Sequence, residues 1–131
     1  MVTIMKRYTP IPSDIQIVDL VSGEPLFLGN AAGERSAWVV SFKGFVCGTL
    51  LPDPKFGKTA STVISGAGIR TALEAPGGVL VLEGDDWELL KSVLESPENR
   101  YKPEIALQLI PFFRAILDAT TTDPRDARRA G

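Results

Sequence analysis

The sequence predicts an α+β fold, in which an N-terminal antiparallel β-sheet or meander is followed by about three helices. Short β-branched segments between turn residues dominate the first half of the chain, and apolar residues at helical spacing dominate the second half. The last helical segment contains Pro111, which lacks a backbone N–H. We therefore expect the terminal helix to be kinked at Pro111, or divided so that Pro111 starts a second piece.

The length and composition indicate one ordinary globular domain. The chain has 131 residues, of which 44% are apolar and 23% charged, as is typical of a globular protein. We assign residues 1–119 to this domain and the polar residues 120–131 to a disordered tail. No segment resembles a signal peptide or approaches the ~20 apolar residues of a membrane-spanning helix. We therefore expect a soluble, cytoplasmic protein.

The first half of the chain contains the predicted strands. Residues 1–13 hold two prolines and should form an irregular or extended lead-in. Residues 15–21 are β-branched and partly alternating, residues 22–25 carry a turn signal, and residues 26–28 are the candidate returning strand. Residues 29–36 are small and polar, which indicates an exposed loop.

The clearest strand prediction covers residues 37–43. Alternation there places three large side chains on one face of a strand, namely Trp38, Val40 and Phe42. Residues 45–51 either extend this strand or start a short helix. Residues 79–82 are too short for a helix, and they form either a strand or a buried connector.

The helical predictions rest on capping signals. A helix over about 59–75 can be capped by Thr59 or Ser61, although its two internal glycines disfavour a helix interior. For those glycines, Gly66 and Gly68, we expect close helix packing or a helix break. The next helix should begin at Asp85 with a capping box completed by Glu88. The terminal helix opens with Pro103 in a favoured first-turn position.

The residue inventory disfavours most catalytic chemistry. The chain has no histidine, and Cys47 is its only cysteine, so Ser-His and Cys-His pairs, internal disulfides and cysteine-rich zinc sites are excluded. Glu83, Asp85, Asp86 and Glu88 form the densest carboxylate cluster, which we interpret as helix-end electrostatics rather than a metal site. We predict no catalytic, metal or cofactor site.

The loop before the helix at residue 59 resembles a phosphate-binding loop only in part. It reads Phe56-Gly57-Lys58-Thr59, but the first glycine of that motif would fall at position 52, which is Pro52. Proline has no N–H with which to bind a phosphate. Lys55 and Lys58 are better interpreted as solvated residues of a turn, although with Lys43 they could form a small basic edge beside Phe56.

The terminal segment is apolar on more than one side. Such a helix is covered either by its own domain, as a core helix, or in part by another protein. We interpret it chiefly as a core helix. If part of it is an interface, the candidate partner-binding residues are Phe112 and Phe113. The other candidates are Lys55, Phe56 and Lys58, in the loop before the helix at residue 59.

Four segments of the chain resemble small proteins encoded in tailed-phage and prophage gene clusters. They read IQIVDLVSGEP (15–25), GTLLPDPKFGK (48–58), LEGDDWELLK (82–91) and YKPEIALQLIPFFRAILDA (101–119). The resemblance implies a bacterial or phage cytoplasmic context and a role in virion assembly, such as a tail or head assembly factor or chaperone. It brings no active-site residues with it.

Two functional hypotheses follow. The first is a non-catalytic protein-protein interaction or assembly protein, which binds a protein partner or itself and is not an enzyme. The alternative is a small nucleic-acid-binding or regulatory module that uses the Lys55–Lys58 loop. The net charge of −2 makes nucleic acid the less favoured partner.

Overall fold

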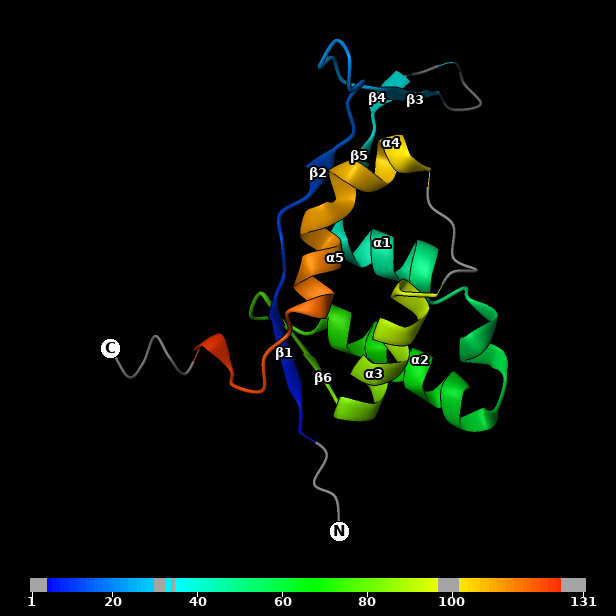
Figure 1. The fold of residues 1–131 in the computed structure, drawn as a ribbon, viewed down its shortest axis with the longest axis vertical. Coiled ribbons are helices and arrows are strands. Elements are labelled where there is room, and N and C mark those ends of the chain that lie inside the picture. Colours follow the sequence, from blue (N-terminus) through cyan, green and yellow to red (C-terminus); the bar gives the residue numbers. More distant parts are fainter. Residues whose placement is uncertain (1–4, 30–32, 34, 97–101, 126–131) are drawn as a thin grey trace.

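The computed structural model describes residues 5–29, 33, 35–96 and 102–125. It has the predicted α+β architecture, with paired strands concentrated at one end and along one side of a helical body (Figure 1). The strands are β1 (Arg7–Pro10), β2 (Ile15–Gln16), β3 (Phe27–Gly29), β4 (Arg35–Ala37), β5 (Val39–Val40) and β6 (Val79–Leu82). The helices are α1 (Phe42–Phe45), α2 (Ala60–Glu74), α3 (Gly84–Leu94), α4 (Pro103–Ala106) and α5 (Ile110–Leu117).

Shorter helical turns complete the chain. A π-helical segment, η1 (Val46–Leu50), continues α1, and two 3₁₀ turns follow as η2 (Pro54–Gly57) and η3 (Leu107–Leu109). Residues 45–51, whose structure the sequence left open, are therefore helical. None of the helices in the described parts of the chain is long and apolar enough to cross a membrane.

The strands of the described residues form antiparallel two-stranded ribbons. The pairs are β1–β6, β2–β5 and β3–β4. In the first pair Arg7 lies opposite Leu82, so residues 79–82 are a strand and the lead-in is extended over Arg7–Pro10. The free edge of β1 is bridged at Tyr8, whose backbone exchanges hydrogen bonds of 2.7 and 3.0 Å with Thr120. The predicted domain boundary after residue 119 stays a prediction, and residues 126–131 lie outside the described residues.

Three backbone hydrogen bonds join the chain at Ile17, Leu26 and Trp38, next to strands β2, β3, β4 and β5. The N–H of Ile17 donates to the carbonyl of Trp38 (2.8 Å), and the N–H of Trp38 donates to Leu26 (2.9 Å). The N–H of Leu26 then donates back to Ile17 (2.9 Å). From this ring of bonds, two hairpins extend away from the helices at the upper end in Figure 1. The first hairpin pairs Val18 with Pro25, and the second pairs β3 with β4. We call their described residues, 17–29 and 35–38, the β arm.

The prediction of a continuous strand over residues 37–43 is wrong at its C-terminal end. Residues 39–40 are a strand, but Ser41 is the N-cap of α1, and its Oγ accepts the N–H of Gly44 (2.9 Å). Phe42 and Lys43 are therefore helical. A serine N-cap followed by helical apolar spacing outweighs the short alternation. The loop predicted over 29–36 is also shorter, because Gly29 and Arg35–Ser36 lie in β3 and β4.

Helix α2 begins as predicted. The Oγ1 of Thr59 accepts the N–H of Thr62 (3.2 Å), and the Thr62 side chain accepts the N–H of Thr59 (3.0 Å). Close packing explains both internal glycines. A methyl group at Gly66 would lie 3.3 Å from the Phe56 ring. A methyl group at Gly68 would lie 3.2 Å from the Asp86 carboxylate.

The N-cap of helix α3 lies two residues earlier in the sequence than predicted. Its N-cap is Glu83, which makes no side-chain cap bond, so the expected capping box of Asp85 and Glu88 is wrong. Asp85 and Asp86 instead lie inside the first turn, where their negative charges stabilise the helix by interacting with the positive end of its dipole. The helix is held against α5 by the buried Trp87, whose indole N–H donates to the carbonyl of Ile116 (2.8 Å).

The terminal segment is divided in the predicted way. It consists of α4, η3 and α5, and Pro111 lies in the first turn of α5, where a missing N–H breaks no helical bond. The segment crosses the core, where the Phe112 ring contacts the rings of Phe42 and Phe45 with centroids 5.6 and 5.8 Å apart. The largest fully buried side chains are Phe42, Phe45, Phe112, Ile17, Leu50, Ile69, Leu80, Leu90, Ile116, Val46 and Val93.

Candidate functional site

Three grooves of the described surface adjoin the short helix α4. A groove of about 400 Å³ separates α4 from α1 and β5, and apolar side chains with Lys102 at the rim line most of it. Its main walls are Trp38, Val40, Phe45, Ile105 and Leu109. A second groove of about 390 Å³ lies between α4 and the 17–26 hairpin. A third, of about 330 Å³, runs along α4 and the start of α5. Helix α4 is thus flanked by depressions on several sides.

Exposed apolar side chains stand beside these grooves. Leu107 is 59% exposed and Ile110 is 38% exposed, and both line the third groove together with Pro103 and Ala106. We call the exposed part of residues 102–110, with the three adjoining grooves, the α4 surface. A contiguous apolar surface on a water-exposed domain is typical of a contact site for another protein.

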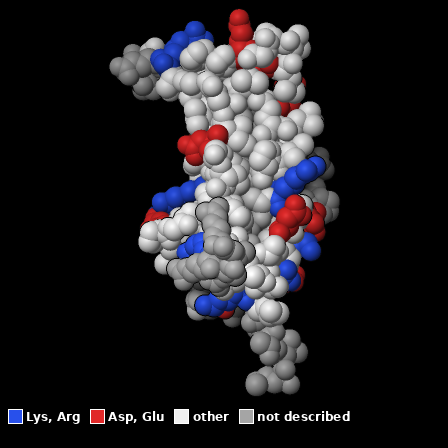
Figure 2. All heavy atoms as spheres, turned by 90° about the vertical axis from the view of Figure 1, so that its left-hand side faces the viewer, with Lys and Arg blue, Asp and Glu red and all other residues white. Residues whose placement is uncertain are grey.

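The β arm adds further apolar side chains at the same end of the molecule. Val21, at the tip of its first hairpin, is 98% exposed. Four other large apolar residues of this region are about half exposed, namely Leu20, Phe27, Leu28 and Val39. Figure 2 shows a face whose upper-middle part carries few charged side chains, while charges lie at the top, along both sides and in the lower half. Most of the large apolar side chains that are exposed in the described residues therefore lie at this end of the molecule.

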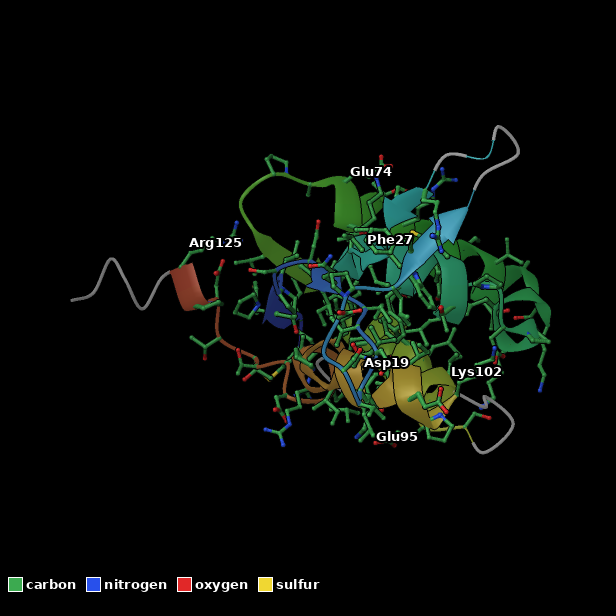
Figure 3. All side chains as sticks on the ribbon, turned by 90° about the horizontal axis from the view of Figure 1, so that it is seen from above. Asp19, Phe27, Glu74, Glu95, Lys102 and Arg125 are labelled. Atoms are coloured by element: carbon green, nitrogen blue, oxygen red, sulfur yellow. The ribbon has the colours of Figure 1, made fainter. Side chains whose placement is uncertain are left out.

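Charges of both signs lie at the rim of the α4 surface. Lys102 and Glu104 are exposed, and within the described residues neither side chain forms an ion pair. Asp19 lies on the hairpin side of the second groove, and Figure 3 shows Asp19 and Lys102 on different sides of α4. The Asp19 carboxylate accepts the N–H groups of Ser22 and Val21 (both 2.9 Å), which lowers its pKa below the ordinary value.

Gln108 fixes the arm against the α4 surface. Its side-chain amide donates to the carbonyl of Val18 (2.9 Å) and accepts the N–H of Val18 (2.8 Å). The same Nε2 also donates to the carbonyl of Glu104 (3.0 Å). Sequence reasoning missed this residue. The available signal was that Gln108 is the only polar side chain between Ile105 and Phe113.

The structure does not bring the predicted partner-binding residues into one site. Phe112 is fully buried and Phe56 is 6% exposed, so both rings belong to the core. Phe113 is half-buried, packs against Phe45 with centroids 5.6 Å apart, and borders the third groove. Only Phe113 among the five residues therefore lies at the α4 surface.

The two candidate lysines lie elsewhere. The η2 turn that carries Lys55 is away from α5 in Figure 1, and Lys58 follows it as an exposed residue. The ammonium group of Lys55 is 3.4 Å from the carbonyl of Ser92, in the last turn of α3. This contact stabilises α3, because a cation near the C-terminal end of a helix complements the helix dipole. The loop is thus a folded 3₁₀ turn with Phe56 buried beneath it.

Charged side chains also line a depression beside Cys47, away from α4. Within residues 5–29, 33, 35–96 and 102–125, no group of three or more Cys, Asp or Glu side chains is arranged to hold a metal ion. Cys47 is half-buried in a depression of about 440 Å³, which Lys43, Arg70 and Glu74 also line. There the ammonium of Lys43 lies 3.1 Å from Glu74, and this contact lowers the pKa of the Glu74 carboxyl.

Comparisons with protein-family models, with curated proteins and with solved structures found no match. The interpretation of the α4 surface therefore depends on its own shape, exposure and charge.

Proposed function

We propose that this chain is a non-catalytic interaction protein that takes part in assembly by docking a protein on its α4 surface. The observation that carries the proposal is the exposure of Leu107 and Ile110 beside apolar grooves around α4. Burying such side chains against another protein contributes roughly 25 cal/mol for each Å² removed from water. The polar groups of the first groove are few, which suits recognition by shape and apolar contact more than chemistry on a bound substrate.

The biological setting is proposed from the resemblance to proteins of tailed-phage and prophage gene clusters. In that setting the chain acts in the cytoplasm of a bacterial host, as a tail or head assembly factor or chaperone, or is carried into the virion. A chaperone engages its client transiently, whereas a structural component buries a larger and more permanent interface. Both roles use protein contacts and neither requires a membrane, a cofactor or nucleic acid.

The test is affinity capture from a lysate of the bacterial host, with variants that separate the α4 surface from the rest of the molecule. Leu107→Asp places a charge on the α4 surface. Ile64→Asp is the matched control, because Ile64 is 70% exposed on α2. If Leu107 is a central contact, its loss should weaken capture about thirtyfold, corresponding to ~2 kcal/mol. Mass spectrometry then shows whether the captured protein is a head or tail component.

Two outcomes would contradict the proposal. One is that the chain captures no protein and does not self-associate. The other is that Leu107→Asp and Ile64→Asp have equal effects on capture, since this would place the contact away from the α4 surface. Circular dichroism of each variant establishes that the comparison is between folded proteins.

The alternative nucleic-acid function has less support from the geometry. Phe56 is buried and Lys55 contacts the end of α3, which leaves Lys58 as the exposed cation of the turn. A nucleic-acid-binding module should show binding that weakens steeply with salt and is lost in the Lys55→Ala, Lys58→Ala double variant. Absence of salt-dependent binding by the unmodified chain would remove this alternative.

A further inference from the structure

We infer that the second groove, between α4 and the 17–26 hairpin, receives a basic side chain of the protein that docks on the α4 surface. This inference rests on the proposed interaction function and adds the chemistry of the partner. The groove is lined by two carboxylate residues, Asp19 on the hairpin and Glu104 in the first turn of α4, and otherwise by apolar side chains. A lysine or arginine matches such a groove, because its aliphatic stem packs on apolar surface while its charged end stays at the carboxylates.

The charge of the second groove has a single sign. Among the described residues that line it, Asp19 and Glu104 carry the only charged side chains. Both are exposed, and neither forms an ion pair within the described part of the chain. Lys102, the N-cap of α4, lines the first groove instead and lies on another side of the helix (Figure 3). The negative charge of the second groove is therefore available to a cation of the partner.

The hairpin side of the groove belongs to an acidic part of the sequence. Between Arg7 and Arg35 the chain contains no lysine or arginine, but it contains four acidic residues, at positions 14, 19, 24 and 34. The whole chain has a net charge of only −2, so its negative charge is concentrated in this stretch. Such a local excess attracts a basic segment of another protein and disfavours an acidic one.

The two walls of the groove are tied together by Gln108. Its Nε2 donates both to the carbonyl of Val18 (2.9 Å), next to Asp19, and to the carbonyl of Glu104 (3.0 Å). The Asp19 carboxylate is held in turn by two backbone N–H groups of the following turn, which donate to its Oδ1 (both 2.9 Å). Within the described residues its other oxygen, Oδ2, accepts no hydrogen bond. A groove that is already formed loses little conformational freedom when a side chain enters it.

The apolar lining favours a side chain over a bare metal ion. The other residues of the groove are Val18, Leu20, Val21, Leu26 and Ile105. Leu20 is 51% exposed and Val21 is 98% exposed, so the stem of a docked side chain would remove apolar surface from water. A hard metal cation takes about six or more oxygen ligands, and these apolar side chains provide none.

The experiment titrates the isotope-labelled full chain with short peptides and follows its backbone amide signals by NMR. The probe is acetyl-Leu-Arg-Leu-amide, and the comparison peptides carry citrulline or glutamate in place of the arginine. Citrulline has nearly the same shape as arginine but no charge. We expect the arginine peptide to shift the signals of Val18, Leu20 and Ile105. It should bind about fivefold more tightly than the citrulline peptide, and the glutamate peptide should bind most weakly.

Conservative variants assign this preference to the two carboxylates. Glu104→Gln and Asp19→Asn should each weaken binding of the arginine peptide by about threefold and leave binding of the citrulline peptide unchanged. Asparagine keeps an oxygen that can accept the N–H groups of the turn at position 19. The control is Glu88→Gln, which removes a charge from an exposed position on α3 and should change neither affinity. Circular dichroism shows that each variant is folded.

Several results would overturn this inference. Equal affinities for the arginine and citrulline peptides are incompatible with it, and so is an arginine peptide that does not bind at millimolar concentrations. Signal changes confined to residues outside the second groove also contradict it, as does an effect of Glu88→Gln as large as that of Glu104→Gln. These failures are separable from failure of the proposed function. A chain that captures a protein through Leu107 but does not distinguish the peptides keeps that function and loses only the basic side chain.

Discussion

The Gln108 side chain forms a pair of hydrogen bonds with both backbone groups of Val18, at 2.8 and 2.9 Å. Val18 lies opposite Pro25 in the hairpin, at a position where its N–H and carbonyl point away from the opposite strand. The amide of Gln108 therefore occupies the place of a neighbouring strand. Through this contact the η3 turn holds Val18, which lines the second groove, beside the α4 surface.

Replacing Gln108 by alanine should destabilise the fold. Both Val18 groups are part-buried, and removal of their partner leaves a donor and an acceptor unsatisfied. We expect Gln108→Ala to lower the free energy of unfolding by about 1–3 kcal/mol, measured by urea denaturation. The control is Gln16→Ala, since Gln16 is exposed and its replacement should change stability by less than about 0.5 kcal/mol. Equal effects of the two substitutions would show that the Gln108 contact contributes nothing.

Truncation of the adjacent rings Phe112 and Phe113 should separate core from surface. Phe112 is fully buried between Phe42 and Phe45, so Phe112→Ala should cost about 3–5 kcal/mol in thermal or urea unfolding. Phe113 is only half-buried, and Phe113→Ala should cost less because fewer contacts are lost. A larger loss of stability at Phe113 than at Phe112 would contradict the observed packing.

The turn at Asp19 should make the protein less stable at low pH. The hydrogen bonds from Ser22 and Val21 lower the folded-state pKa of Asp19 below the value of the unfolded chain. A lowered carboxyl pKa gives stability that is complete above the unfolded pKa and is lost as pH falls through the folded pKa. Below about pH 4 the free energy of unfolding should therefore fall less steeply with decreasing pH in the Asp19→Asn variant than in the unmodified protein. An NMR titration in which Asp19 titrates at or above the ordinary value would refute the prediction.

Two glycines should respond to alanine in opposite directions. Gly48 lies in η1 with open space where a methyl group would be added, so Gly48→Ala should stabilise the protein by about 0.5–1 kcal/mol. Gly77 has φ 113°, and an added methyl group would lie 2.8 Å from the Arg125 side chain. Gly77→Ala should therefore destabilise it by about 1–3 kcal/mol in urea unfolding. Stabilisation at both positions would show that the turn before β6 relaxes without strain.

Local signals allowed much of the helical structure to be predicted. Thr59 was one of two predicted caps for α2, and a division at Pro111 was one of two predicted outcomes there. Both could be predicted because each depends on hydrogen bonds within a few residues. The same reasoning placed the start of α3 wrongly, since an acidic residue before a helix can serve either as cap or as first-turn charge. At residues 37–43 an alternating pattern and a serine cap competed, and the cap prevailed from Ser41 onwards.

The candidate site was harder to predict than the helices. Apolar residues at helical spacing have the same pattern whether their own chain or another protein covers them, so the sequence alone could not separate Phe112 from Leu107. The order of residues likewise does not show that Lys43 pairs with Glu74, whereas Lys102 and Glu104 have no ion pair among the described residues. Burial and charge pairing are properties of the folded chain.

By itself, the sequence determined the α+β class, the start of α2 and the break at Pro111, because these depend on interactions between residues close together in the chain. Only the tertiary structure decided that β1 pairs with β6, that Ile17, Leu26 and Trp38 meet in one ring of bonds, and that Gln108 holds Val18. These contacts join residues far apart in sequence. They form only when packing of the core brings the segments together, and that packing leaves α4 as the exposed apolar surface.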